Sequence, residues 1–116
     1  MEIVKQEHVQ ELISSFANKD VYIHLETTNG SYAGHFKEGF LNAGAFIRNV
    51  VIKFEIGKIE GESPHRVGLK LPLGWVYAQG ITHFTVDKYG RLLMAGLDAE
   101  GKLCVALHIS ETPFSY

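Results

Sequence analysis

Two runs of alternating apolar and polar residues flank an Asn-Gly pair in the segment VYIHLETTNGSYAGHF, residues 21–36. Asn-Gly between two such runs is the strongest short-range signal of a β-hairpin, because a type I′ turn needs positive φ at both central residues. With Asn29 and Gly30 as the loop, counting outward places His24 opposite His35. The face expected on the core then contains Val21, Ile23, Leu25, Tyr32 and Phe36.

An amphipathic helix is predicted before this hairpin, over residues 5–18. Apolar residues recur there at helical spacing, and Lys, Gln and Glu lie opposite them. One such helix cannot bury its apolar stripe alone, so we expect it to cap or cross the sheet. The stripe consists of Val9, Leu12, Ile13 and Phe16.

Residues 45–60 have a strand-like pattern that is long for one straight strand. We therefore expect a bend, or a β-bulge near Asn49 or Gly57. Residues 67–73 and 74–80 are predicted to form two further short strands.

Two last hairpins are predicted, joining residues 81–86 to 91–97 and 91–97 to 102–109. Their loop lengths pair Phe84 with Leu93, Leu97 with Leu103, and Leu93 with Leu107. This register leaves a second apolar face, which should be covered by the helix or by a second subunit. That face consists of Leu92, Met94, Cys104 and Ala106.

The pattern predicts a mainly β fold, a small antiparallel β-barrel or compact sandwich of about seven strands with one N-terminal helix. The strands cover residues 21–110, and the 116 residues are expected to form a single domain.

Composition favours a cytoplasmic protein. The net charge is −2 with scattered basic residues, so no bulk field attracts phosphate backbones or anionic lipid. A single cysteine, Cys104, cannot form an internal disulfide, which indicates a reducing compartment. The sequence contains neither a signal-peptide pattern nor the run of about 20 apolar residues that a membrane span requires.

The predicted hairpin register suggests a metal site. Directly opposed residues of a hydrogen-bonded pair have Cα atoms about 5.5 Å apart, so His24 and His35 could converge on one divalent ion. Glu26, diagonal to His35, could add a carboxylate, and two His with one carboxylate suit a catalytic zinc or iron. The alternative is that these residues only decorate a solvated face, since no dedicated ligand motif is present.

Other candidate residues favour structural roles. His83 and His108 are expected as near neighbours on the outer face of the last hairpins, packed beside aliphatic groups. Cys104 is expected to be a small buried hydrophobe. Four aromatic residues could line a ligand pocket, but we assign them to the core and the barrel mouth: Trp75, Tyr77, Tyr22 and Tyr32.

Two family resemblances add context. A helix leading into VYIHLETTNGSYAG resembles the start of an Sm-like barrel, which implies RNA binding, but the chain lacks a basic patch and the second Sm signature. The segments MEIVKQEHVQELI, VYIHLETTNGSYAGHF, LPLGWVYAQGITHF and LCVALHISETPF resemble the YojF-like family of Bacillus-type bacteria. That resemblance brings no catalytic residue. It implies proximity to a deacetylase of bacillithiol biosynthesis.

Three hypotheses result. The first is a non-enzymatic cytoplasmic module that binds a partner protein or small ligand, as a homodimer or larger assembly. The second is a metal-binding protein or metal-dependent enzyme that uses His24, His35 and Glu26. The third is RNA binding through an Sm-like face, which the charge disfavours. The sequence assigns no other cofactor and no other catalytic residue.

Overall fold

The structure, a computed structural model, describes residues 1–28 and 44–115, so the Asn29-Gly30 turn, Tyr32 and His35 lie outside the described part. The described residues form one helix and nine strands. In chain order these are β1 (Glu2–Ile3), α1 (Gln6–Ser14), β2 (Val21–Thr27), β3 (Ala45–Ile52), β4 (Ile56–Glu60), β5 (His65–Leu71), β6 (Gly74–Ile81), β7 (His83–Val86), β8 (Leu92–Leu97) and β9 (Leu103–Ser110).

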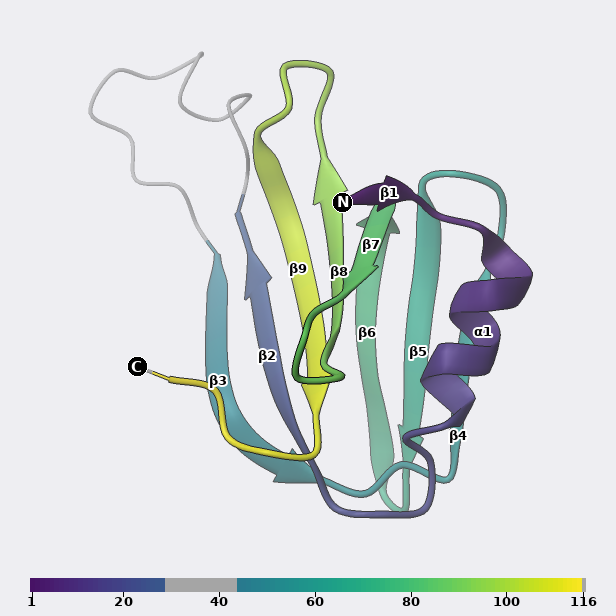
Figure 1. The fold of residues 1–116 in the computed structure, drawn as a ribbon, viewed down its shortest axis with the longest axis vertical. Coiled ribbons are helices and arrows are strands. Elements are labelled where there is room, and N and C mark those ends of the chain that lie inside the picture. The colour runs from purple at the N-terminus through teal and green to yellow at the C-terminus, as the bar shows by residue number, and fades with distance from the viewer. Residues whose placement is uncertain (29–43, 116) are drawn as a thin grey trace.

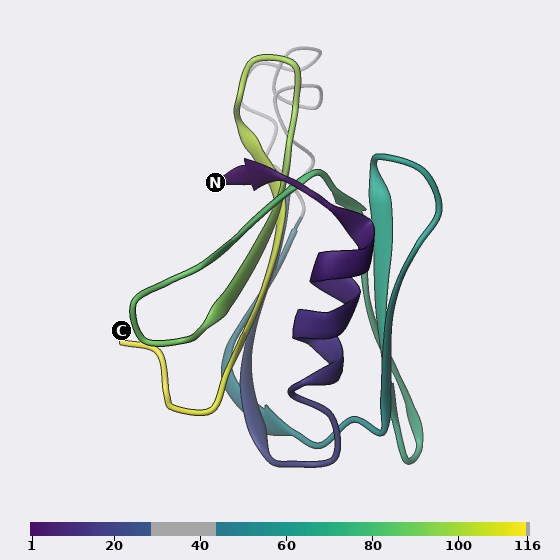
Figure 2. The ribbon, with the colours of Figure 1, turned by 45° about the vertical axis from the view of Figure 1, so that its right-hand side comes forward.

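The strands form two antiparallel sheets (Figure 1). One has the order β1-β7-β8-β9-β2-β3, and the other has the order β4-β5-β6. Figure 2 shows α1 on the open side between the two sheets. The mainly β prediction with one helix is confirmed in its sandwich form, because the described strands stay in two sheets and do not close into a barrel. The helix is too short and too polar to cross a membrane, and the described part contains no other helix.

The core lies between the sheets and under the helix. The predicted helical stripe is confirmed, since Val9, Ile13 and Phe16 are buried there. The helix is shorter than predicted, because after Ser14 the chain tightens into i→i−3 hydrogen bonds and then turns at Asn18, whose φ is 63°. Other fully buried core residues include Val21, Ile23, Phe54, Leu69, Leu92, Met94, Leu107 and Ile109.

The predicted pairing of His24 with His35 is wrong. Strand β2 is paired along both of its edges, with β3 on one side and β9 on the other. The ladder positions opposite His24 belong to Arg48 and His108. The core face of β2 is nevertheless as predicted for Val21 and Ile23, because alternation depends on the strand itself and not on its neighbours.

The register of the last two hairpins differs in part from the prediction. Leu97 pairs with Leu103 as expected, but a bulge follows, and Leu93 pairs with His108 instead of Leu107. In the first hairpin a three-residue loop closes at Asp87, where a four-residue loop was expected, so Phe84 pairs with Met94. The one-residue slip exchanges the two faces of β8.

That exchange places Leu92 and Met94 in the core, both fully buried. Two residues of the apolar face that was expected to be covered by the helix or by a second subunit, Leu92 and Met94, are therefore covered by the chain itself, whereas Ala106 lies on the opposite face, beside Ala95. The predicted irregularity in residues 45–60 is confirmed. Asn49 is the extra residue of a bulge between β2 and β3, with a φ of 60°.

Candidate functional site

A group of polar and aromatic side chains lies on the outer face of the six-stranded sheet, where β3, β2 and β9 are neighbours. The ladder places His24 of β2 between Arg48 of β3 and His108 of β9. Residues directly opposite in an antiparallel ladder point to the same face, so these three side chains meet. We use the name histidine cluster for His24, Glu26, Arg48, His108 and Phe114.

His24 is only 4% exposed, and both of its ring nitrogens have a partner. Nη1 of Arg48, which can only donate, lies 3.1 Å from Nδ1 of His24. Nδ1 is therefore the acceptor, and Nε2 holds the proton and donates to Oε1 of Glu26 at 3.2 Å. The arginine thus fixes the tautomer of the imidazole and aims its N–H at the carboxylate.

The ring of His108 lies 5.1 Å from that of His24, centroid to centroid. Burial, the largest cause, lowers the pKa of His108 to about 4. Coulombic repulsion from a protonated His24, and then from Arg48 and Arg91, acts in the same direction. The carboxylate of Asp87 acts in the opposite direction. His108 is therefore neutral near pH 7 and does not repel its neighbours.

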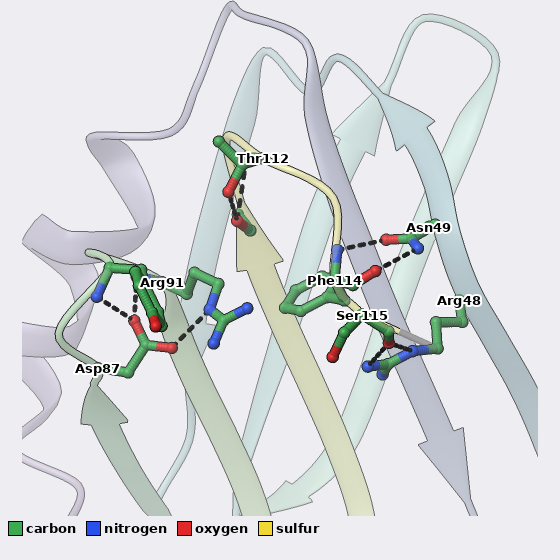
Figure 3. Close-up of polar contacts among 9 residues, drawn as sticks. Arg48, Asn49, Asp87, Arg91, Thr112, Phe114 and Ser115 are labelled. Carbon is green, nitrogen blue, oxygen red and sulfur yellow. Dashed lines mark hydrogen bonds and ion pairs between the residues drawn. The ribbon is translucent and has the colours of Figure 1, made fainter.

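The C-terminal tail, residues 111–115, brings Phe114 to the two histidines and is held by Arg48 and Asn49 of β3, and Figure 3 shows these two residues beside Phe114 and Ser115. Asn49 donates from Nδ2 to the carbonyl oxygen of Phe114 at 2.8 Å and accepts from its N–H at 2.7 Å. Arg48 donates from Nε to the carbonyl oxygen of Ser115 at 2.8 Å, and its Nη2 donates to the same oxygen. The Phe114 ring is 5% exposed, with its centroid 6.4 Å from the His24 ring and 6.1 Å from the His108 ring.

Two guanidinium groups flank Phe114. The Cζ of Arg48 lies 5.3 Å from the ring centroid, and that of Arg91 lies 5.5 Å away. Asp87 holds Arg91 in place through an Nε–Oδ2 contact of 2.5 Å (Figure 3). Burial alone would raise the pKa of Asp87, but hydrogen bonds from Arg91 and from the Tyr89 N–H lower it overall.

These contacts hold the C-terminal tail in place and leave a substrate little access to the two imidazole rings. In the described part of the chain, every buried side-chain polar atom has a hydrogen-bond partner. A general base must reach its substrate, whereas His24 is buried and the half-buried His108 lies beside the Phe114 ring. The geometry is that of a satisfied polar cluster that fastens a chain end.

The predicted metal site is only partly described. His24 and Glu26 contact each other, but His35 lies outside the described residues, so the three-residue site stays a prediction. Within residues 1–28 and 44–115, no group of three or more His, Cys, Asp or Glu could hold a metal ion. A metal on His24 would also have to displace Arg48 from Nδ1 or Glu26 from Nε2.

Other expected positions need correction. His83 lies on β7, separated from β9 by β8, and its row contains Ala95 and Ala106 where His108 was expected. Cys104 is half-buried at the bulge of β9. Trp75 and Tyr77 were assigned to the core and the barrel mouth but are 46% and 45% exposed on the outer face of the three-stranded sheet.

Sequence reasoning missed the residues that organise this site. Arg48 and Asn49 interrupt the apolar alternation of their segment, and that interruption was the available signal. The sequence around Phe114 and Arg91 contains no comparable signal, because the roles of these two residues depend on which strands become neighbours.

Three comparisons with known proteins relate this chain to the same group of proteins. The family described as "Protein of unknown function (DUF1806)" matches residues 3–114. "Uncharacterized protein YojF" of Bacillus subtilis (strain 168) is 48% identical over 115 residues, covering 99% of both chains. The crystal structure of Bacillus subtilis YojF is 42% identical, with a TM-score of 0.81 over 99% of this chain and 97% of that one. The resemblance to YojF-like proteins is confirmed, and the chain belongs to this family of unknown function, DUF1806.

Proposed function

We propose that this protein is a non-catalytic, cytoplasmic binding module that associates through the outer edge of β3, with a second copy of the chain as its first partner. The observation that supports this most is a contrast between two edge strands, β3 and β4.

The edge of β4 is covered by side chains of the helix. Gln10 accepts from the Ile59 N–H at 3.0 Å and donates to the Gly57 carbonyl oxygen at 2.8 Å. Gln6 donates to the Ile59 carbonyl oxygen at 3.0 Å. These two amides replace a neighbouring strand and satisfy the backbone groups that an edge would otherwise expose.

The edge of β3 has no such cover in the described part of the chain, where β2 is its one neighbouring strand. Its large apolar side chains are exposed on both faces of the sheet. Phe46, 67% exposed, and Val51 point to the outer face, while Ile47 and Val50 point to the inner face. A long, apolar, uncovered edge is a preferred place for strand addition.

A second copy fits this edge by symmetry. Two antiparallel β3 strands related by a twofold axis present the same residues to each other, so one apolar surface is sufficient for both partners. Pairing would extend the six-stranded sheet across the dimer. The bulge at Asn49 bends the strand, and Arg48 and Asn49 direct their side chains to the C-terminal tail, so pairing would use the residues on either side of the bulge.

The experiment is a measurement of mass in solution by size-exclusion chromatography with light scattering. We expect a dimer at about 100 μM and a monomer for Val51→Lys, because an edge lysine opposes strand pairing. Val86→Lys on β7 is the matched control and should stay dimeric, since Val86 is also exposed. A monomeric wild type, or a dimeric Val51→Lys variant, would overturn the proposal.

We also propose, as the resemblance to YojF-like proteins implies, that this module acts beside a deacetylase in bacillithiol metabolism. Deleting the YojF gene of Bacillus subtilis should lower cellular bacillithiol, and this chain should restore it. An unchanged thiol level after deletion would reject the link while leaving the dimer proposal intact.

A further inference from the structure

The outer face of the three-stranded sheet contains two exposed aromatic rings that lie against each other. Trp75 and Tyr77 lie two residues apart on β6 and therefore point to the same face. Their ring planes differ by only 4°, at a centroid distance of 5.3 Å. Two adjacent exposed rings form one apolar patch, and such patches mark ligand or partner contacts more often than single exposed side chains do.

A glycine beneath the two rings leaves the space that they occupy. Gly68 of β5 pairs directly with Tyr77. A Cβ built on Gly68 would lie 2.8 Å from Cε1 of Tyr77 and 3.4 Å from Cζ3 of Trp75. Any side chain here would lift the rings, so the glycine keeps them low over the sheet. A cavity of about 70 Å³ remains between the rings and Lys58, Glu60, Arg66 and Gly68.

Two basic side chains, Arg66 and Lys58, lie beside the two rings and Gly68. The guanidinium of Arg66 lies 3.9 Å from the centroid of the Tyr77 ring, and Lys58 pairs with Gly68 from the other side. Within residues 1–28 and 44–115, neither Lys58 nor Arg66 forms an ion pair, whereas nearby Lys70 is neutralised by Glu55 at 2.8 Å. Glu60 supplies one negative charge, so the rim has an excess of one positive charge.

A purely structural role explains part of this arrangement. An aromatic ring that covers a strand glycine stabilises a sheet, and Tyr77 does this for Gly68. That role requires one ring. It explains neither the exposed face of Trp75 nor the excess of one positive charge on the rim.

We propose that Lys58, Arg66, Gly68, Trp75 and Tyr77 form an aromatic platform that binds a small anion containing a ring with a flat face. The ring stacks on Trp75, and the acidic group of the ligand meets Lys58 and Arg66. The flat face can belong to a nucleobase or to the C–H face of a sugar, and both share this chemistry. The platform lies on the other sheet from β3, so this proposal does not depend on the proposed dimer.

The chain provides its own probe, because Trp75 is its one tryptophan. Titration with adenosine monophosphate and with glucose 6-phosphate should change Trp75 fluorescence for at least one ligand, and the responding ligand identifies the kind of ring. Adenosine, glucose and inorganic phosphate are the partial ligands and should each bind more weakly. Binding should weaken as salt rises, because the cations are exposed. No response to either phosphate at millimolar concentration would overturn the proposal.

Variants locate the site by calorimetry with the responding ligand. Trp75→Ala should weaken binding roughly 5- to 100-fold, the range expected for the loss of one stacking ring. Gly68→Val should weaken it by lifting both rings, and Lys58→Ala should weaken it without disturbing the sheet. Tyr89→Ala is the matched control, since Tyr89 is also exposed and lies 4.9 Å from a guanidinium, that of Arg91. Unchanged affinity in Trp75→Ala and Lys58→Ala, or equal loss in Tyr89→Ala, would contradict this location.

Discussion

The side-chain amide of Asn49 exchanges two hydrogen bonds with the backbone of Phe114, which lies 65 residues further along the chain. Asn49 is also the bulged residue of β3, with a φ of 60°. One residue therefore bends an edge strand and fastens the C-terminal tail over the histidine cluster. The positive φ aims the amide at the tail, and asparagine tolerates this conformation better than most residues do.

Replacing Asn49 with glycine should separate these two roles. Asn49→Gly keeps the positive φ without strain but removes both hydrogen bonds to Phe114. We expect the free energy of unfolding to fall by about 1–2 kcal/mol, and Tm to fall by roughly 5–10 °C. Thermal unfolding followed by circular dichroism measures this change.

Asn18 supplies the control. Its φ is 63°, and among the described residues its side chain forms no hydrogen bond. Asn18→Gly should therefore leave Tm within about 2 °C of the wild type. Equal effects of the two substitutions would show that the Asn49 side chain contributes nothing to holding the tail.

The buried imidazole of His108 predicts a dependence of stability on acid pH. Its pKa is about 4 in the folded protein, against an ordinary value of 6.5, so the unfolded chain binds the extra proton between these values. Stability is therefore fully present above about pH 6.5 and is lost as the pH falls toward 4. The loss should be on the order of 2 kcal/mol, less than the full shift implies because His108 is partly accessible to water.

His108→Gln tests this directly. Glutamine does not titrate, so urea unfolding between pH 7 and pH 4 should show a shallower loss of stability than in the wild type. His8→Gln, on the exposed face of α1, should keep the wild-type dependence. If the His108→Gln curve parallels the wild type, another group is responsible for the acid sensitivity.

The features that depend on local periodicity could be predicted from the sequence. The stripe of Val9 and Ile13 and the inward positions of Val21 and Ile23 follow from spacing along one element, and the structure has them where expected. The bulge at Asn49 was also foreseeable, because Arg-Asn interrupts a run of β-branched residues.

The histidine cluster could not be predicted, because it depends on which strands become neighbours. His24 meets His108 only because β9 pairs with β2, across most of the chain. The Asn-Gly signal suggested a nearer partner for β2, and long-range pairing of both edges overrode it. In β8, an extra residue in β9 at Cys104 and a loop after Asp87 that is one residue shorter than expected decide that Leu92 faces the core, and spacing alone locates neither.

A zinc titration followed by Tm tests the predicted metal site at His24, His35 and Glu26. Because Arg48 and Glu26 already occupy both ring nitrogens of His24, we expect 100 μM Zn²⁺ to change the Tm of the untagged protein by less than about 1 °C. A clear rise that disappears in both His24→Ala and His35→Ala would contradict this expectation and support the predicted site. Arg48→Gln serves as a comparison, because it frees Nδ1 of His24 for a metal.

The junction of the two sheets depends on a close approach between two glycines. A Cβ on Gly96 of β8 would lie 2.1 Å from the carbonyl oxygen of Gly80 at the end of β6, and 2.6 Å from Cγ1 of Val105. The chain leaves β6 here and enters the other sheet through Thr82, whose N–H donates to the Ala95 carbonyl oxygen at 2.9 Å. A side chain on Gly96 would push these two backbones apart and break that connection.

Gly96→Ala should therefore destabilise the protein by about 3 kcal/mol or more, because the obstacle is backbone and cannot rotate away. Gly74→Ala is the control, since a Cβ on Gly74 meets nothing within 4 Å. Urea unfolding of the two variants measures the difference, which should appear as a lower midpoint with an unchanged slope. A Gly96→Ala variant as stable as Gly74→Ala would mean that β6 and β8 can separate at this point without loss, and that the contact does not hold the sheets together.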